Sequence, residues 1–90
     1  MSSPLEELIG ALVVIDVVSP YVYLGKLAEH RADFLLLEDV DVHDLRDVGT
    51  TREKYVLDSR LHGIRTNRRR VWLSLREVVG ISRLDEVVPY

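Results

Sequence analysis

The stretch Leu12–Val42 constrains the fold of this chain more than any other part of the sequence. It contains three apolar runs rich in Val, Ile, Tyr and Leu, which are separated by Ser19-Pro20 and by the charged segment His30–Asp33. Such residues favour strands, and short separators of turn-forming or charged residues favour direct reversals between them. Gly25 lies in the middle of the second run, where a glycine often marks a bulge or a sharp bend. The stretch therefore predicts three consecutive antiparallel strands.

The same criteria give the full set of strands. We expect long strands at Leu12–Val18, Tyr21–Glu29 and Phe34–Val42, followed after a gap by two shorter strands at Val71–Leu75 and Val78–Ser82. Long strands that bend and twist are able to close a small antiparallel barrel. The sequence therefore predicts a mainly β protein built on a strongly bent sheet of five strands.

The end of the third predicted strand alternates between apolar and polar residues. Alternation with a period of two places successive side chains on opposite faces of a sheet. We expect the apolar residues to point inward, namely Leu36, Val40 and Val42. We expect the polar residues to point outward, namely Asp39, Asp41 and His43. Carboxylates and an imidazole are potential metal ligands, but the spacing selects no particular metal. Solvated side chains are the simpler interpretation, so we expect neither a metal site nor a cofactor.

A capping box begins a short helix near the N-terminus. Ser3 suits the N-cap, Pro4 suits the first helical position, and Glu6 stands three residues after the serine. Gly10 is able to end the helix in a left-handed conformation. We expect a helix at Pro4–Ile9 that lies against the barrel.

A second capping box lies between the third and fourth strands. Thr50 suits the N-cap and Glu53 is its reciprocal partner, which predicts an inserted helix at about Thr51–His62. The apolar side of this helix carries three residues at helical spacing, namely Leu57, Leu61 and Ile64. We expect this stripe to be buried against the barrel or against a neighbouring subunit.

Length and composition favour one small domain that covers residues 1–90. With 47% hydrophobic and 30% charged residues, the chain is typical of a globular rather than a disordered protein. The sequence contains no cysteine, which excludes disulfides, thiolate metal sites and a cysteine nucleophile. The start of the chain lacks the basic segment and apolar core of a signal peptide, and the apolar run Ala11–Val18 is too short to cross a bilayer. We expect a cytoplasmic protein without a membrane partner.

The net charge of −3 hides an uneven distribution. Residues 1–51 hold three basic and ten acidic side chains, a balance of −7, whereas residues 52–83 hold nine basic and three acidic ones, a balance of +6. Asp85 and Glu86 supply the remaining −2. The two halves either form a mixed solvated surface, or they provide complementary faces for self-association or a basic patch for an anionic partner.

The segment Arg65–Arg70 is the strongest candidate for contacts with an anionic partner. We expect it to form a basic turn before the fourth strand. After Asn67, the three successive arginines Arg68, Arg69 and Arg70 are able to contact phosphates. Trp72 and the tyrosines are able to stack on bases. The alternative is a solvated or intersubunit turn that pairs with the acidic half of the chain.

The order of a short helix, three long strands, an insertion and two short strands resembles that of the Sm and Sm-like proteins. The resemblance rests on four segments, namely Leu8–Gly10, Gly25–Leu27, Phe34–Asp39 and Val78–Ile81. It implies the Sm-like (SH3-like) five-stranded antiparallel barrel. It also implies a ring in which the fourth strand of one subunit pairs with the fifth strand of the next, and the binding of single-stranded RNA at loops that face the pore.

Two functional classes follow from the sequence and this resemblance. The first is a non-enzymatic module that assembles into a homo-oligomeric ring, with an interface that includes Val71, Leu73, Val79 and Ile81. The alternative is a single-stranded RNA-binding protein, whose candidate contacts are Arg31, Asn67, Arg68, Arg69, Arg70 and Arg76. We expect no enzymatic activity, because the sequence contains neither a recognisable catalytic set nor a glycine-rich phosphate loop.

Overall fold

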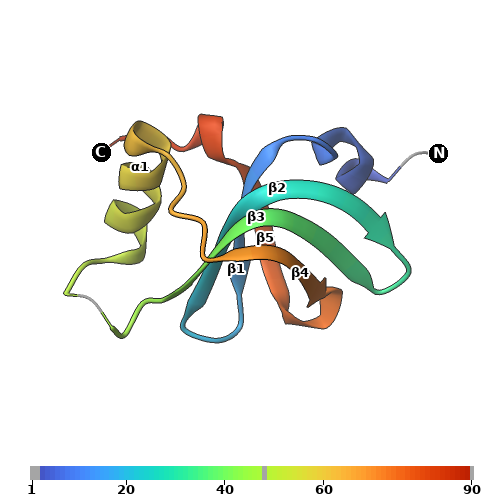
Figure 1. The fold of residues 1–90 in the computed structure, drawn as a ribbon, viewed down its shortest axis with the longest axis horizontal. Helices are drawn as coiled ribbons and strands as arrows, with labels where there is room; N and C mark the ends of the chain where they lie inside the picture. Colours follow the sequence, from blue (N-terminus) through green and yellow to red (C-terminus); the bar gives the residue numbers. More distant parts are fainter. Residues whose placement is uncertain (1–2, 48, 90) are drawn as a thin grey trace.

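A computed structural model describes residues 3–47 and 49–89 of the chain. Their strands form a five-stranded antiparallel sheet with the order β4-β3-β2-β1-β5 (Figure 1). The strands are β1 (Leu12–Val17), β2 (Tyr21–Arg31), β3 (Phe34–Asp44), β4 (Arg68–Ser74) and β5 (Val78–Arg83). The chain returns to its first strand at the end, because β5 pairs with β1. This arrangement confirms the prediction of a mainly β fold with five antiparallel strands.

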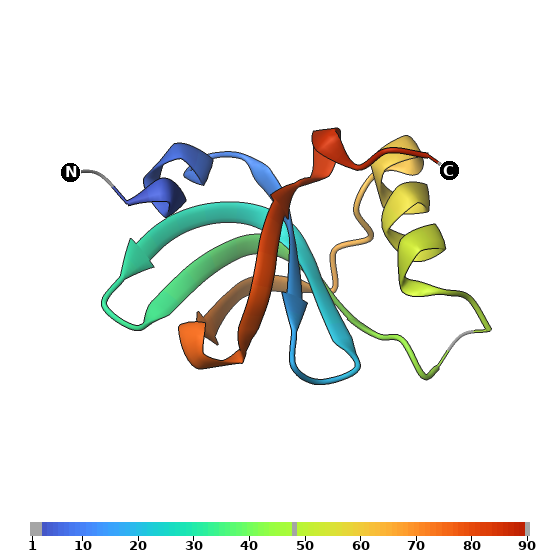
Figure 2. The ribbon, with the colours of Figure 1, turned by 180° about the vertical axis from the view of Figure 1, so that it is seen from behind.

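The sheet bends sharply because β2 and β3 are irregular at facing positions. The pairing register between these strands shifts twice, and Asp39 on β3 has a φ of 52°. A Cβ atom added at Gly25 would lie 3.1 Å from the carbonyl oxygen of Glu38 and 3.2 Å from two atoms of Val40. Glycine therefore allows the two strands to approach closely at the bend. Figures 1 and 2 show the resulting curvature of β2 and β3, which confirms the predicted bend at Gly25.

The curvature divides the buried side chains into two clusters. The inner cluster is formed by Val13, Ile15, Val17, Leu27, Leu35, Leu37, Val40 and Leu73. The second cluster is formed by Val14, Val22, Leu24, Val56 and Leu84. β1 contributes alternate residues to both clusters, which explains why its sequence is apolar on both faces.

The helical segments lie around this sheet. They are η1 (Pro4–Leu8), α1 (Arg52–His62), η2 (Leu75–Glu77) and η3 (Leu84–Glu86), of which all but α1 are 3-10 helices. The N–H group of Leu5 donates to Oγ of Ser3 at 3.3 Å, as expected for a serine N-cap. Figures 1 and 2 show η1 and α1 at opposite ends of the sheet. In the described part of the chain, no helix has the length and apolar character needed to span a membrane.

Most element boundaries differ from the sequence predictions by one or two residues, and two differences at β4 and α1 affect the interpretation. β4 begins at Arg68 rather than at Val71, because β3 continues far enough to pair Glu38 with Arg70 and Val40 with Arg68. The three arginines expected in a turn therefore belong to a strand. The N-cap of α1 is Thr51 rather than Thr50, and its side chain accepts a hydrogen bond from the N–H group of Lys54 at 3.2 Å.

The predicted buried stripe of α1 is wrong at Leu61, whose side chain is 63% exposed. Ile64 packs against the second cluster and Leu57 is half-buried, whereas the buried residues of the helix are Val56 and Ser59. The helix faces the sheet through a partly polar surface. The hydroxyl of Ser59 donates to the carbonyl of Tyr55 at 3.1 Å, and the guanidinium of Arg52 binds the carboxylate of Asp16 at 2.9 Å. These contacts allow polar side chains to occupy positions that apolar periodicity assigns to solvent.

Candidate functional site

The turn between β2 and β3 lies beside the turn between β4 and β5. Ala32 has a φ of 50° and allows the tight reversal that pairs Arg31 with Phe34. The N–H group of Leu75, at the start of η2, donates to the carbonyl of Asp33 at 2.8 Å. The fold therefore brings Arg31 and the η2 turn, which contains Arg76, to the same end of the sheet.

Arg31 forms an exposed surface together with two aromatic residues. Its guanidinium carbon lies 5.9 Å from the ring centroid of Trp72, and its Nη2 binds the carboxylate of Glu29 at 2.9 Å. Phe34 is 46% exposed and Trp72 is 48% exposed, and the ladder places Trp72 directly across from the buried Leu36. We call Arg31, Phe34 and Trp72 the turn-end patch. An arginine beside exposed aromatic rings is suited to bind a stacked base and a phosphate.

The remaining predicted RNA contacts lie elsewhere. Arg68, Arg69 and Arg70 are exposed at the start of β4, which is an outer strand of the sheet. Asn67 has a structural position instead, because its side chain accepts from the N–H group of Val42 and donates to the carbonyl of Val42, both at 3.0 Å. These bonds extend the β3–β4 ladder by one side chain. The predicted RNA-contact residues therefore form two separate arginine groups and one ladder residue.

The predicted interface residues lie on the two outer strands. In the part of the chain that the structure describes, β4 pairs only with β3, and β5 pairs only with β1. Val79 is 69% exposed, while Val71 and Ile81 are half-buried against the inner cluster. The side chain of Leu73 is buried in the subunit's own core. Leu73 is therefore available to a neighbour through its backbone but not through its side chain.

A polar cluster joins α1 to the sheet. It comprises Asp41, His43, Tyr55 and Asn67, of which Asp41 is the buried member. Asp41 is only 2% exposed, so the prediction that it points into solvent is wrong. The hydroxyl of Tyr55 donates to Oδ2 of Asp41, and Nδ2 of Asn67 donates to Oδ1 at 3.3 Å. The outward face of β3 is covered by the inserted helix here, and these two donors compensate the burial of the carboxylate.

The aromatic rings of the polar cluster are stacked. The ring centroids of His43 and Tyr55 lie 3.6 Å apart with an interplanar angle of 10°. Burial and the hydrogen bond to the Asp41 carboxylate both raise the pKa of the Tyr55 phenol. The phenol therefore stays protonated near neutral pH and acts as a hydrogen-bond donor. Nε2 of His43 is buried and has no hydrogen-bond partner within residues 3–47 and 49–89.

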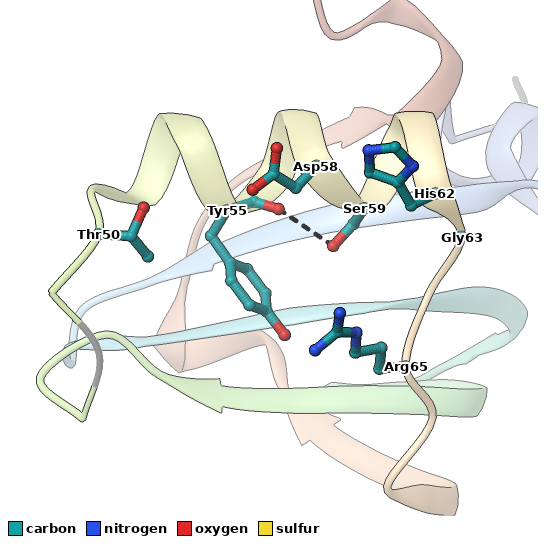
Figure 3. A pocket seen from close by; sticks show the side chains of 7 residues that line it. All are labelled: Thr50, Tyr55, Asp58, Ser59, His62, Gly63 and Arg65. Carbon is teal, nitrogen blue, oxygen red and sulfur yellow. Dashed lines mark hydrogen bonds between the residues drawn. The ribbon is translucent and has the colours of Figure 1, made fainter.

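A cavity of about 340 Å³ opens beside the polar cluster (Figure 3). It is lined by Thr50, Tyr55, Asp58, Ser59, His62, Gly63 and Arg65. Figure 3 shows the hydroxyl end of Tyr55 and the guanidinium of Arg65 pointing toward one another across it. The hydroxyl of Ser59 is bound to a carbonyl of its own helix, so this serine is not arranged as an activated nucleophile. Among the lining residues, Tyr55 attaches α1 to the sheet through its hydrogen bond to Asp41.

The polar row at the end of β3 does not form a common ligand face. Asp39 is exposed at a left-handed backbone position, Asp41 is buried under α1, and His43 stacks on Tyr55. Among the described residues, no group of three or more His, Cys, Asp or Glu side chains is arranged to hold a metal ion. The polar cluster could not be read from the sequence, because its members are spread from residue 41 to residue 67 and only the fold brings them together.

Comparison with known proteins gives structural matches only. No family model and no curated protein sequence matches this chain. An Sm protein of Pyrococcus abyssii, solved in complex with a uridine heptamer, superposes with a TM-score of 0.60 over 91% of this chain and 99% of that chain, at 13% identity. A chain of the NatC complex bound to Gag peptide and CoA gives a TM-score of 0.56 over 86% of both chains, at 20% identity.

A chain of the NatC complex bound to CoA is also similar in structure. It superposes with a TM-score of 0.60 over 96% of this chain and 90% of that chain, at 18% identity. The likeness to the Sm protein spans nearly the whole of both molecules and includes the bent antiparallel sheet. The chain therefore has the Sm-like fold.

Proposed function

We propose that this protein is a non-enzymatic assembly module whose copies join into a homo-oligomeric ring through the edges of β4 and β5. The observation that carries this proposal is the strand order, which leaves β4 and β5 as the two outer strands of the sheet. Each outer strand presents a row of backbone donors and acceptors that a second strand is able to pair with. β5 contains neither proline nor lysine, the residues that commonly block such pairing.

Pairing of β4 with β5 of the next copy joins two different surfaces, so each contact leaves a free β4 at one end and a free β5 at the other. Such head-to-tail contacts close into a ring when the rotation between neighbours allows it. The contact would cover the exposed side chain of Val79 and extend the apolar surface of Val71 and Ile81. Backbone pairing and apolar burial both favour this assembly.

Sedimentation velocity of the unmodified protein tests the proposal. We expect an oligomer at micromolar concentration, and we expect Val79→Lys to shift the protein toward the monomer because it places a charge in the contact. Val18→Lys is the matched control, because Val18 is 67% exposed and lies outside both outer strands. A wild-type protein that stays monomeric at high micromolar concentration would exclude the ring.

Binding of single-stranded RNA is a second candidate function, and the turn-end patch favours it. Arg31 lies over Trp72, exposed Phe34 is adjacent in the ladder, and the bond between Leu75 and Asp33 holds the Arg76 turn nearby. The Sm protein with the same fold was solved with a uridine heptamer. A ring would repeat this patch once per subunit, so that one RNA strand would contact several copies.

A further inference from the structure

A second hollow, of about 310 Å³, lies where β5 ends and η3 begins. Its lining consists of Ala11, Leu12, Arg60, Arg83, Leu84 and Asp85. We call it the β5-end hollow. Leu12 is half exposed there, while Leu84 is buried. The hollow therefore combines an apolar lining with charged groups.

The arginines of the β5-end hollow already have partners on their own chain. The guanidinium of Arg60 donates to the carbonyl of Val87. Nε of Arg83 lies 3.5 Å from the carboxylate of Asp85 and 4.0 Å from that of Glu86. The side chains of these two acids are 72% and 70% exposed, and a carboxylate accepts several hydrogen bonds. The two exposed carboxylates are therefore able to accept from a further guanidinium, and the exposed part of Leu12 offers apolar surface to its aliphatic stem.

Symmetry places such arginines at the β5-end hollow. β4 ends at the η2 turn and β5 begins there. In a ring, this turn has the same distance from the axis in every copy, so β4 and the β5 of a neighbour run antiparallel with their turn ends together. The two strands have seven and six residues. The start of β4, with Arg68 and Arg69, therefore lies beside the end of the neighbouring β5.

We infer that the β5-end hollow receives the start of β4 from a second copy of this chain. Arg68 and Arg69 pair with Asp85 and Glu86 of that copy, and their aliphatic stems cover Leu12. The inference rests on the proposed ring and explains how the ring contact selects one strand register and one partner. Backbone hydrogen bonds alone allow several registers between two strands, whereas charge pairs at one end favour a single register and a single kind of partner.

Charge reversal tests this inference. The first variant carries Arg68→Glu and Arg69→Glu, and the second carries Asp85→Arg and Glu86→Arg. Each reversal turns attraction into repulsion at every contact, and we expect the dissociation constant of the assembly to rise about tenfold or more at low salt. Lys26→Glu with Lys54→Glu is the matched control for the first variant: it changes the net charge equally on exposed residues away from the two outer strands.

The head-to-tail geometry allows two rescue measurements. A chain with all four substitutions carries an acidic β4 and a basic β5 end, so we expect its assembly to return to within about threefold of the wild type. An equimolar mixture of the two variants should also assemble, because each one offers the edge that the other lacks. Sedimentation equilibrium measures the dissociation constant of the assembly for each of these proteins, and circular dichroism checks that each variant is folded.

The outcomes separate the inference from the proposal on which it rests. A monomeric wild type would exclude the ring and the inference together. If the wild type assembles and both charge-reversal variants assemble as tightly as the lysine control, the inference would be overturned and the proposed ring would stand. The inference would also be overturned if both charge reversals weaken assembly and neither the variant with all four substitutions nor the mixture restores it. The charges would then not be paired with each other.

Discussion

Asp41 connects three parts of the molecule through one carboxylate. The residue lies on β3 and accepts two hydrogen bonds. One comes from the hydroxyl of Tyr55 on α1, and the other comes from the amide of Asn67 just before β4. A buried carboxylate that loses a donor keeps its desolvation penalty. The insertion between β3 and β4 is therefore attached to the sheet at a point where small chemical changes have large effects.

Tyr55→Phe should lower the free energy of unfolding by about 1–3 kcal/mol, because it removes the hydroxyl donor and leaves the Asp41 carboxylate buried. Urea denaturation followed by circular dichroism measures the change. Tyr23→Phe is the control: Tyr23 is half-buried against the inner cluster, and its replacement should change stability by about 0.5 kcal/mol or less. Equal effects of the two substitutions would mean that the bond to Asp41 adds no stability.

Asp44 provides a test based on protonation. The guanidinium of Arg46 donates to both carboxylate oxygens, at 2.9 and 2.8 Å, and lowers the pKa of Asp44 from 3.8 to about 2. A lowered carboxyl pKa stabilises the fold above pH 3.8 and loses that contribution as the pH falls toward 2. We expect Arg46→Ala to raise the pKa of Asp44 in an NMR titration but not to its full ordinary value, because the N–H group of residue 46 still donates to the Asp44 carboxylate. An unchanged pKa would show that another group holds the carboxylate.

At the scale of elements, α1 shows why apolar spacing alone misplaced a helix face. The sequence contains Leu57 and Leu61 at helical spacing, yet the helix buries Val56 and Ser59. Arg52, Tyr55 and Ser59 each make a hydrogen bond that compensates for their burial or fixes the helix on the sheet. Partners 14 and 36 residues away decide this orientation, and no local pattern contains them.

Val56→Ala should therefore lower the free energy of unfolding by about 2 kcal/mol, because it removes two buried carbons and leaves a cavity. Leu61→Ala should change it by about 0.5 kcal/mol or less, since the leucine is 63% exposed. Chemical denaturation of both variants below the concentration at which the protein associates gives the comparison. A large loss at Leu61 alone would restore the orientation that apolar spacing predicts.

At the scale of the whole molecule, the bent five-stranded sheet could be predicted because its signals are local. Apolar runs, short separators and Gly25 are each visible within a few residues. The candidate surfaces could be predicted only in part. Arg31 and Arg76 stand 45 positions apart in the sequence, and the β4–β5 turn brings their loops together. The sequence predicted a turn at the start of β4 because three successive arginines are not an apolar strand pattern. They nevertheless belong to a strand that pairs with β3.

RNA binding is also a property of the whole molecule, because it depends on repeated patches. If the turn-end patch holds single-stranded RNA, the affinity for oligouridine should fall steeply with salt. Arg31→Ala in the patch, combined with Arg76→Ala in the neighbouring η2 turn, should reduce the slope of log K against log salt by about 1.4 for each engaged subunit, which corresponds to two phosphates.

Fluorescence anisotropy at several salt concentrations measures the slope. Lys26→Ala with Lys54→Ala controls for the loss of two positive charges. An unchanged slope in the arginine variant would remove this patch from consideration, and absence of binding by the wild type would remove the RNA function.

The pairing of β5 with β1 has a consequence for how the chain folds. Val13 pairs with Arg83, so the sheet acquires its fifth strand only after Arg83 has been synthesised. Contacts between such distant residues slow folding, because a long loop must close before they are gained. During synthesis, β1 therefore carries an open apolar edge until β5 is available, and a chain that stops before Val78 should aggregate rather than fold.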